Sequence, residues 1–380
     1  MNRTDEAQVF VLDTPHGAVR ALPLEQVIAL AGLAAGAAVR APDQLPLLAA
    51  AWRRRGAVAV CVTSPGAAPG RPIHWLDTAQ ARGWASGDVS LDIAAWLPAW
   101  QARLADGHGP ADAALLAWPA LPWLSWGDQP APARLAPTAA PPSADAPLGL
   151  YAIVDSAAAL RRVLQAGVRT AQLRVKRPAD ADAAWASALR AAVRDSLLAA
   201  ADQGALLFIN DHWRLAAELG ARAVHLGQED LLALGEAGRA ELGASGLGLG
   251  VSSHAVWELC RARSLAPRYI ACGPVWPTTT KDMPWRPQGL DNLAWWCRSA
   301  DAPVVAIGGI LTPDQVRQAA AAGASGVCVL RGLGPDPLLS VGALQQAFAH
   351  GRHEAQARAG QPLQPLPMAQ RPHPTLGPAP

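Results

Sequence analysis

Several features that would assign the chain to a special class are missing from its 380 residues. Its five cysteines are scattered and include no C-x-x-C pair, which favours a reducing, cytoplasmic setting over a disulfide framework. The net charge of +2 is too small to attract nucleic acid or a membrane surface. The apolar run Val27–Val39 falls well short of the roughly 18 residues that span a bilayer. The polar, acidic start is unlike a secretory signal. We therefore expect no nucleic-acid or membrane partner.

Proline-rich segments divide what remains. Residues 130–147 contain six prolines and no hydrophobic periodicity, which is typical of a semi-rigid linker. Residues 351–380 have a similar composition and are expected to form a disordered tail. These segments predict a small domain at 1–129 and a larger one at 148–350.

One pattern recurs through the larger domain: a short apolar run, a polar turn and a helical stretch. The runs predict strands at 149–154, 170–174, 205–209, 223–226, 247–251, 268–272, 303–307 and 326–330. Helical periodicity lies between them, for example at 157–164, 180–201, 255–264 and 313–322. Alternating strands and helices build parallel sheets. Eight such strands predict an α/β fold, a closed (β/α)₈ TIM barrel, over the alternative of an open doubly wound sheet.

Polar residues follow most of these predicted strands. In a barrel of this kind the reacting groups lie on the loops at the carboxyl ends of the strands. The residues in those positions are Arg174, Lys176, Asn210, Asp211, Gln228, Asp230, Ser252, Thr278–Lys281 and Gly308–Gly309. We therefore expect them to share one rim.

Asp211 and Asp230 follow two successive predicted strands, so the two carboxylates are expected to lie near each other. Two such charges repel unless a cation lies between them. Mg²⁺ typically takes one or two carboxylates and completes its shell with water and substrate phosphate. The pair therefore favours a Mg²⁺–diphosphate site. The alternative is that each acid caps the helix that follows it.

The remaining rim residues suggest two anion sites. Gln172 and Arg174 alternate inward along a predicted strand, where polar side chains indicate a lined ligand site. The hydroxyls of 278–280 and the ammonium of Lys281 can bind phosphate. Glycines after the strands at 303–307 and 326–330 let backbone N–H groups approach a phosphate monoester. An enzyme that joins a diphosphate-activated fragment to a phosphorylated one needs both sites.

Six motifs occur in the order QLRVK (172–176), ND (210–211), HLGQED (225–230), GVSSH (250–254), GPVWPTTTK (273–281) and AIGGI (306–310). In this order they closely resemble the thiamine-phosphate synthase family (thiamine-phosphate pyrophosphorylases), over residues 148 to about 335. The resemblance implies a transferase that joins 4-amino-2-methyl-5-(diphosphooxymethyl)pyrimidine to hydroxyethyl-thiazole phosphate, or to its carboxylated form. The products are thiamine phosphate and pyrophosphate, and the diphosphate leaves first.

The resemblance also implies residue roles. Asp211 and Asp230 would hold Mg²⁺, and Arg174, Lys176 and Lys281 would stabilise the leaving group. The pyrimidine diphosphate would be bound by Gln172, Leu173, Arg174, Val175, Lys176, Asn210, Ser252 and Lys281. The thiazole phosphate would be bound by Thr278, Thr279, Thr280, Gly309, Leu330 and Arg331. Because this reaction requires no general base, His225 is expected to be a hydrogen-bonded core residue.

One residue departs from the family pattern, because Arg331 stands where the family usually has serine, which puts phosphate affinity at that corner in question. Two other functions stay open: a thiazole tautomerase-like barrel and a non-catalytic sensor of thiamine-pathway phosphates. The Asp211/Asp230 pair and Lys281 argue against the tautomerase, which has no diphosphate to neutralise. The partners expected are small phosphorylated molecules, and the sequence is compatible with a homo-oligomer.

The first 129 residues are expected to form a small α/β domain. Strands are predicted at 56–64 and 71–77, and a helix at 44–54. Trp118, Trp123 and Trp126 are expected in a core rather than at an interface. Residues 41–120 faintly resemble the C-terminal part of hydroxymethylpyrimidine-phosphate kinase, a ribokinase-like enzyme. The glycine-rich anion-hole segment of that family is absent, which predicts a non-catalytic remnant.

Overall fold

The computed structural model describes residues 8–15, 17–22, 24–30, 44–63, 74–87, 91–126, 147–279 and 286–358. Its contacts divide the chain into two compact units. The barrel unit comprises Ala140–His254 and Ala266–Leu366. The N-terminal unit comprises Met1–Ala139 and Pro367–Pro380 together with Ala255–Leu265, a segment from the middle of the barrel sequence. Among the described residues, no helix is long and apolar enough to cross a membrane.

Eight parallel strands close into a barrel in the order β10-β11-β12-β13-β14-β7-β8-β9. The strands are β7 Gly149–Val154, β8 Thr170–Leu173, β9 Leu206–Asn210, β10 Ala223–Leu226, β11 Gly248–Ser253, β12 Tyr269–Cys272, β13 Val304–Ala306 and β14 Gly326–Val329. All eight predicted strands are confirmed to within two residues. Because the ring closes, no strand has an unpaired edge.

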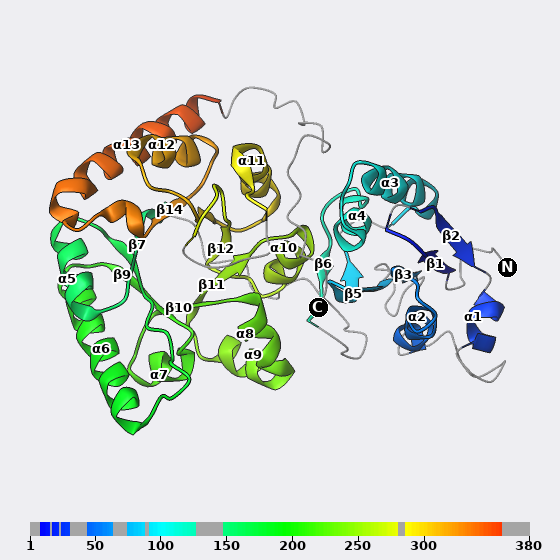
Figure 1. Ribbon diagram of the computed structural model, residues 1–380, viewed down its shortest axis with the longest axis horizontal. Coiled ribbons are helices and arrows are strands. Elements are labelled where there is room, and N and C mark those ends of the chain that lie inside the picture. The colour runs from blue at the N-terminus through cyan, green and yellow to red at the C-terminus, as the bar shows by residue number, and fades with distance from the viewer. Residues whose placement is uncertain are drawn as a thin grey trace. The chain divides into compact units, whose positions relative to one another are not determined.

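Helices surround these strands (Figure 1). In the barrel unit they are α5 Ala157–Gln165, α6 Ala183–Asp202, α7 Trp213–Glu218, α8 Gln228–Ala233, α9 Gly235–Ala244, α11 Gly289–Ser299, α12 Pro313–Ala321, the 3-10 helix η3 Arg331–Leu333 and α13 Pro337–Arg358. The helix expected to begin at Asp180 begins at Ala183, because the side chain of Asp182 accepts a hydrogen bond from Trp185 N (2.8 Å) and caps it.

The last helix extends past the expected domain end at residue 350. α13 continues to Arg358, and Glu354 near its end pairs with Arg317 of α12 (2.9 Å). The first part of the segment expected to be a disordered tail is therefore helical. Residues 359–380 lie outside the described residues, as do 127–146, which include nearly all of the predicted linker.

The N-terminal unit contains a six-stranded antiparallel sheet in the order β2-β1-β3-β4-β5-β6. Its strands are β1 Gln8–Leu12, β2 Val19–Leu22, β3 Ala59–Thr63, β4 His74–Thr78, β5 Arg82–Ser86 and β6 Trp123–Leu124. Its helices are α1 Leu24–Leu30, α2 Leu45–Arg53, α3 Ile93–Ala105 and α4 Pro110–Leu116. Helix α2 confirms the helix predicted at 44–54, and β3 and β4 confirm residues 59–63 and 74–77 of the strands predicted at 56–64 and 71–77. Residues 64 and 71–73 lie outside the described residues, and the other elements of this unit were not predicted.

Side chains alternate across this sheet, as the two-residue repeat of a strand requires. On one face Val9 and Val11 pack with Leu48 of α2. On the other face the ring of Phe10 meets Trp96 of α3 edge to face (5.5 Å between centroids). Trp118 and Trp126 are buried, which confirms them as core residues, whereas Trp123 is half-buried.

His74 at the start of β4 lies in this core without a hydrogen bond. It is 3% exposed, and neither ring nitrogen has a partner among the described residues. The ring packs edge-on against Trp118. Burial lowers the pKa of His74 from 6.5 to about 4. The imidazole is therefore neutral in the folded protein at neutral pH.

The pKa of His74 predicts a loss of stability in acid. Between pH 6.5 and 4 the unfolded chain binds a proton that the folded chain does not, so the stability present above pH 6.5 declines as the pH falls. In His74→Phe, the decrease in unfolding free energy between pH 7 and pH 5 should be about 2 kcal/mol smaller than in the unmodified chain. Urea titrations followed by tryptophan fluorescence would measure it. His353→Gln, a change at an exposed site on α13, should leave the decrease unaltered.

Candidate functional site

The closed parallel barrel brings the carboxyl ends of its strands to one rim, and the predicted site residues come from those ends. Arg174 and Lys176 follow β8, Asn210 ends β9, and Ser252 is the second-last residue of β11. Thr278 and Thr279 follow β12, Gly309 follows β13, and Leu330 and Arg331 follow β14. Thr280 and Lys281 lie outside the described residues.

Asp211 has an unusual backbone. Its φ is 64°, a left-handed value that few residues other than glycine adopt, although Asp and Asn tolerate it best. The conformation is fixed on both sides, because Asp211 N donates to His225 O (3.1 Å) and Asp211 O accepts from Trp213 N (2.9 Å). The carboxylate accepts a hydrogen bond from Lys176 Nζ at 2.6 Å. Such outliers are commonly retained at functional sites.

Asp230 stands in the first turn of α8, where its carboxylate accepts a hydrogen bond from Gly227 N (3.1 Å). This contact is the helix-capping role that was the alternative for this residue. A capping carboxylate keeps lone pairs for a second partner. Among the described residues, no cluster of three or more His, Cys, Asp or Glu side chains could hold a metal ion. A metal at this rim would therefore depend on few protein ligands.

A chain of hydrogen bonds runs through the barrel interior to Ser252. Gln172 Nε2 donates to the hydroxyl of Tyr151 (3.3 Å), which lies 2.9 Å from the hydroxyl of Tyr269. Tyr269 in turn lies 2.7 Å from His225 Nδ1, and His225 Nε2 lies 2.8 Å from Ser252 Oγ. All but Ser252 are less than 9% exposed. His225 is thus confirmed as a hydrogen-bonded core residue.

The chemistry of these groups limits the directions that the hydrogen bonds of this series can take. Burial raises the pKa of both tyrosines, so both hydroxyls keep their protons. Burial lowers the pKa of His225 to about 4, so the imidazole is neutral and has one donor and one acceptor. Gln172 Nε2 donates to Tyr151, whose oxygen can accept a second hydrogen bond, so either tyrosine can donate to the other. In the tautomer of His225 that accepts at Nδ1 from Tyr269, Nε2 donates to Ser252 Oγ and the hydroxyl proton of Ser252 is left for another acceptor.

Charged groups of the rim also act on His225. The charge of Asp211 raises the pKa of His225, whereas Lys176, Arg174 and His254 lower it. Each of these effects is smaller than the effect of burial. Groups from the loops after β8, β9 and β11 therefore all influence this one imidazole. Gly250 makes room for the interior chain, because a Cβ there would lie 2.4 Å from the ring of Tyr269.

A second corner of the rim is built from the loops after β12, β13 and β14. Gly309 has a φ of 72°, and a Cβ on it would lie 2.6 Å from Trp276 O. Only glycine allows the two loops to approach this closely. Arg331 Nη1 donates to Thr279 Oγ1 (3.0 Å). The structure therefore brings Thr279, Gly309 and Arg331 to neighbouring loops, as expected for the second anion site.

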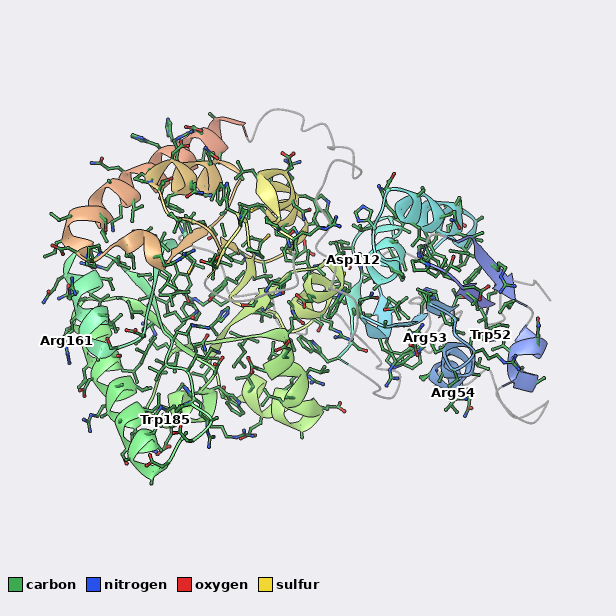
Figure 2. All side chains as sticks on the ribbon, viewed as in Figure 1. Trp52, Arg53, Arg54, Asp112, Arg161 and Trp185 are labelled. Atoms are coloured by element: carbon green, nitrogen blue, oxygen red, sulfur yellow. The ribbon has the colours of Figure 1, made fainter. Side chains whose placement is uncertain are left out.

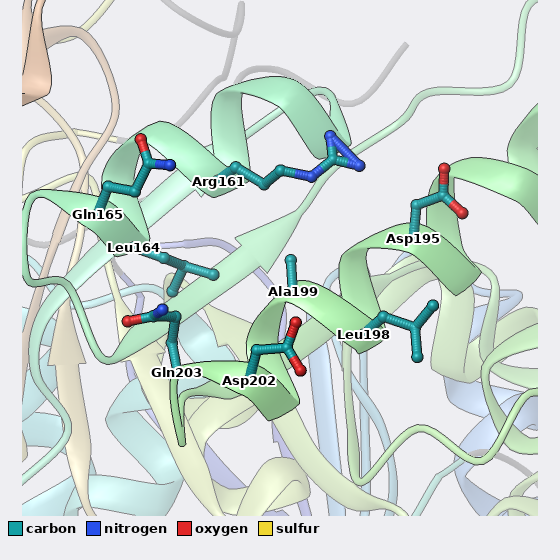
Figure 3. A pocket seen from close by; sticks show the side chains of 8 residues that line it. All are labelled: Arg161, Leu164, Gln165, Asp195, Leu198, Ala199, Asp202 and Gln203. Carbon is teal, nitrogen blue, oxygen red and sulfur yellow. The ribbon is translucent and has the colours of Figure 1, made fainter.

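A hollow of ≈ 470 Å³ lies elsewhere on the barrel unit, between α5 and α6. Figure 3 shows the polar side chains Arg161, Asp195 and Asp202 around the apolar Leu164 and Ala199. None of the predicted site residues lines it. It is therefore a surface feature of the helical layer and not part of the rim.

The sequence interpretation did not include Tyr151 and Tyr269 in the site. A signal was available, because these are the only two tyrosines in the chain and each lies inside a predicted strand, in GLYAIV and RYIAC. The register of the strands decides which side of the sheet each tyrosine faces. It also decides whether the two hydroxyls meet.

Fold and rim define the class: a (β/α)₈ barrel with two groups of polar and basic side chains at the carboxyl ends of its strands. A family model described as thiamine monophosphate synthase matches residues 150–333. The thiamine-phosphate synthase of Neisseria meningitidis serogroup A is 45% identical over 186 residues, which cover 49% of this chain and 86% of the relative. The thiamine-phosphate synthase of Yersinia pestis strain Pestoides F is 44% identical over 194 residues, which cover 50% of this chain and 84% of that relative. The chain belongs to the thiamine-phosphate synthase family.

A solved structure, the thiamine phosphate pyrophosphorylase from Pyrococcus furiosus, is 26% identical, with a TM-score of 0.47. The match covers 54% of this chain and 96% of that one.

The interior hydrogen bonds give a testable difference between the two tyrosines. Tyr269→Phe removes the hydroxyl that contacts His225 Nδ1, so the tautomer of His225 and its hydrogen bond with Ser252 are no longer fixed by that contact. We expect kcat/KM for thiamine phosphate formation to fall by about tenfold, the usual effect of one hydrogen bond. Tyr151→Phe is the matched control, because Tyr269 can still donate to His225, and its loss should be smaller. Equal losses in the two variants would show that the contact between Tyr269 and His225 has no special role in the reaction.

Proposed function

We propose that the barrel unit is a thiamine-phosphate synthase. It would join 4-amino-2-methyl-5-(diphosphooxymethyl)pyrimidine to hydroxyethyl-thiazole phosphate, or its carboxylated form, and release pyrophosphate. The observation that carries this proposal is that two groups of basic and hydroxyl side chains, each suited to an anion, lie on one rim in a chain of this family. A tautomerase-like barrel or a phosphate sensor would need only one of them.

The first corner suits the pyrimidine diphosphate. Arg174 and Lys176 supply positive charge beside Asn210, whose buried amide nitrogen Nδ2 has no hydrogen-bond partner among the described residues. A buried donor without a partner costs free energy unless a ligand satisfies it. The hydroxyl of Ser252 would provide a second donor in the tautomer in which His225 Nε2 donates to it. Gln172, Leu173 and Val175 complete this proposed site along the end of β8 and the residues after it.

Mg²⁺ fits the same corner. Asp211 and Asp230 follow the neighbouring strands β9 and β10 and offer the hard oxygen ligands that this ion prefers. Its chemistry there would be to neutralise charge on the diphosphate as it leaves. The protein's own part is positional: the left-handed backbone of Asp211 directs one carboxylate, and the first turn of α8 directs the other. Lys176, now paired with Asp211, would be free to bind the diphosphate once a metal takes its place.

The metal assignment can be tested without disturbing the backbone. Asp211→Asn keeps a residue that tolerates the left-handed φ but removes the charge. We expect at least about a 100-fold loss of Mg²⁺-dependent kcat, since metal stabilisation of a leaving group amounts to several kcal/mol. Asp230→Asn should act similarly. Glu229→Gln, next to Asp230 on α8, is the matched control and should retain full activity. Normal rates and normal Mg²⁺ dependence in Asp211→Asn would refute the assignment.

The second corner suits the thiazole phosphate. Thr278, Thr279 and Thr280 supply hydroxyls, and the glycines after β13 and the Leu330-Arg331 turn expose backbone N–H groups. The hydrogen bond from Arg331 to Thr279 holds a guanidinium at the phosphate corner. A guanidinium binds phosphate as a two-pronged donor, so this departure from the family's serine would strengthen the corner.

Lys281 is assigned to the leaving diphosphate. Charge on the departing oxygens grows along a path in which diphosphate leaves first, so the ammonium binds the transition state more strongly than the substrate. Lys281→Ala should therefore lower kcat and kcat/KM together, with little change in the KM for thiazole phosphate. Thr278→Val, at the phosphate that does not react, should mainly raise that KM. Steady-state kinetics with each substrate varied in turn would decide between these patterns.

Pyrophosphate release with both substrates present would separate the proposed function from its alternatives. A tautomerase or a sensor would release none. The five free cysteines support a reducing compartment such as the cytoplasm. Oligomeric state, like the absence of nucleic-acid and membrane partners, stays a prediction from the sequence.

A further inference from the structure

One helix is buried to an unusual degree. In α10 (Val256–Arg263) every residue is buried, including Glu258, Arg261 and Arg263. A helix on the outside of a barrel normally keeps a polar face in water. In the sequence α10 joins β11 to β12, yet its segment Ala255–Leu265 clusters with the N-terminal unit. The polar face of α10 is therefore covered by residues of that unit.

The first turn of α10 is capped by a residue far away in the sequence. Ala255 at the N-cap has no side chain that can accept a hydrogen bond. Instead the carboxylate of Asp112 on α4, 1% exposed, accepts from Val256 N (3.3 Å) and Trp257 N (2.9 Å). Figure 2 labels Asp112. A carboxylate at a helix N-terminus satisfies free N–H groups and complements the helix dipole.

The two arginines of α10 find their partners in the same unit. Arg261 donates from Nε to Ser125 O (3.2 Å) and from Nη2 to Arg82 O (2.8 Å). Arg263 Nη1 donates to Leu121 O (2.8 Å), and its guanidinium lies over the ring of Trp123. Buried charges are tolerated only when they are hydrogen-bonded in this way. The polar residues of α10 are matched to this surface rather than to water.

The segment that joins Ser252 to α10 is short, and two of its residues are hydrogen-bonded within the barrel unit. Ser252 precedes Ala255 by three residues. In the barrel unit, Ser253 Oγ accepts from Gln228 Nε2 (3.0 Å) and His254 O accepts from Gln288 Nε2 (2.7 Å). Three extended residues span only about 10 Å. Ser252 and the first turn of α10 are therefore close neighbours along the chain.

We propose that the N-terminal unit is the structural support of the β11–α10 turn, and that Asp112 is a positioning residue for Ser252. The unit then serves the synthase rather than a separate reaction. This inference rests on the proposed role of Ser252 at the pyrimidine diphosphate. Its effect should be specific: loss of the Asp112 contacts should weaken binding of the pyrimidine diphosphate and leave binding of the thiazole phosphate unchanged.

The test uses the full chain with Asp112→Ala. Hydrogen–deuterium exchange should become faster at the amides of Val256 and Trp257 in α10, while the amides of the barrel strands stay protected. The KM for the pyrimidine diphosphate should rise roughly fivefold, the factor that corresponds to loss of a typical N-cap, and the KM for thiazole phosphate should not change. Asp112→Asn keeps one accepting oxygen and should therefore show a smaller effect. This variant replaces Asp112→Ala in the test if the alanine variant does not fold.

Asp77→Asn is the matched control. Asp77 is also a buried carboxylate of the N-terminal unit and pairs with Arg53 (3.1 Å), on α2. It should lower the melting temperature without changing either KM. Unchanged exchange at α10 in Asp112→Ala would overturn the proposal, as would an equal rise in KM in Asp77→Asn. Faster exchange with an unchanged KM would overturn the coupling to Ser252. A normal KM in Ser252→Ala would instead refute the proposed site.

Discussion

Closure of the parallel barrel is the constraint on which the rest of the structure depends. Eight strands that all run the same way and pair in a ring must end at one rim, so residues distant in sequence meet there without any long-range signal between them. Lys176 and Asp211 lie on different loops and still form a hydrogen-bonded pair at 2.6 Å. The loops after β12 and β13 approach so closely that Gly309 can carry no side chain.

The barrel interior adds a second constraint, because polar groups inside it must satisfy one another. Burial keeps Tyr269 protonated and His225 neutral, and each then has a fixed number of donors and acceptors. The interior thus orients one hydroxyl at the rim, that of Ser252, without any group changing its protonation state near neutral pH. A reaction driven by departure of a leaving group needs that kind of orientation more than it needs a base.

Much of this was predictable from the sequence, because each barrel strand is a short apolar run that ends in a polar turn. Motif order and spacing were enough to place Asp211 and Ser252 on one rim. The left-handed backbone of Asp211 and the link from Tyr269 to His225 were not predictable, since both depend on how neighbouring strands align. In the N-terminal unit the two-residue β6 is too short to give a periodic signal. Lys281, central to the predicted chemistry, lies outside the described residues.

Composition could not show that the segment Ala255–Leu265 clusters with the N-terminal unit. A proline-rich segment suggests a single boundary, and every recognisable motif lies beyond it. Buried Arg261 and Arg263 require hydrogen-bond acceptors, and the carbonyls that accept from them belong to residues 82–125. Composition carries no sign of these contacts, because they depend on which carbonyls the folded chain brings to the helix. Strand β11, which carries Ser252, leads directly into a helix whose buried arginines bind carbonyls from the first third of the chain.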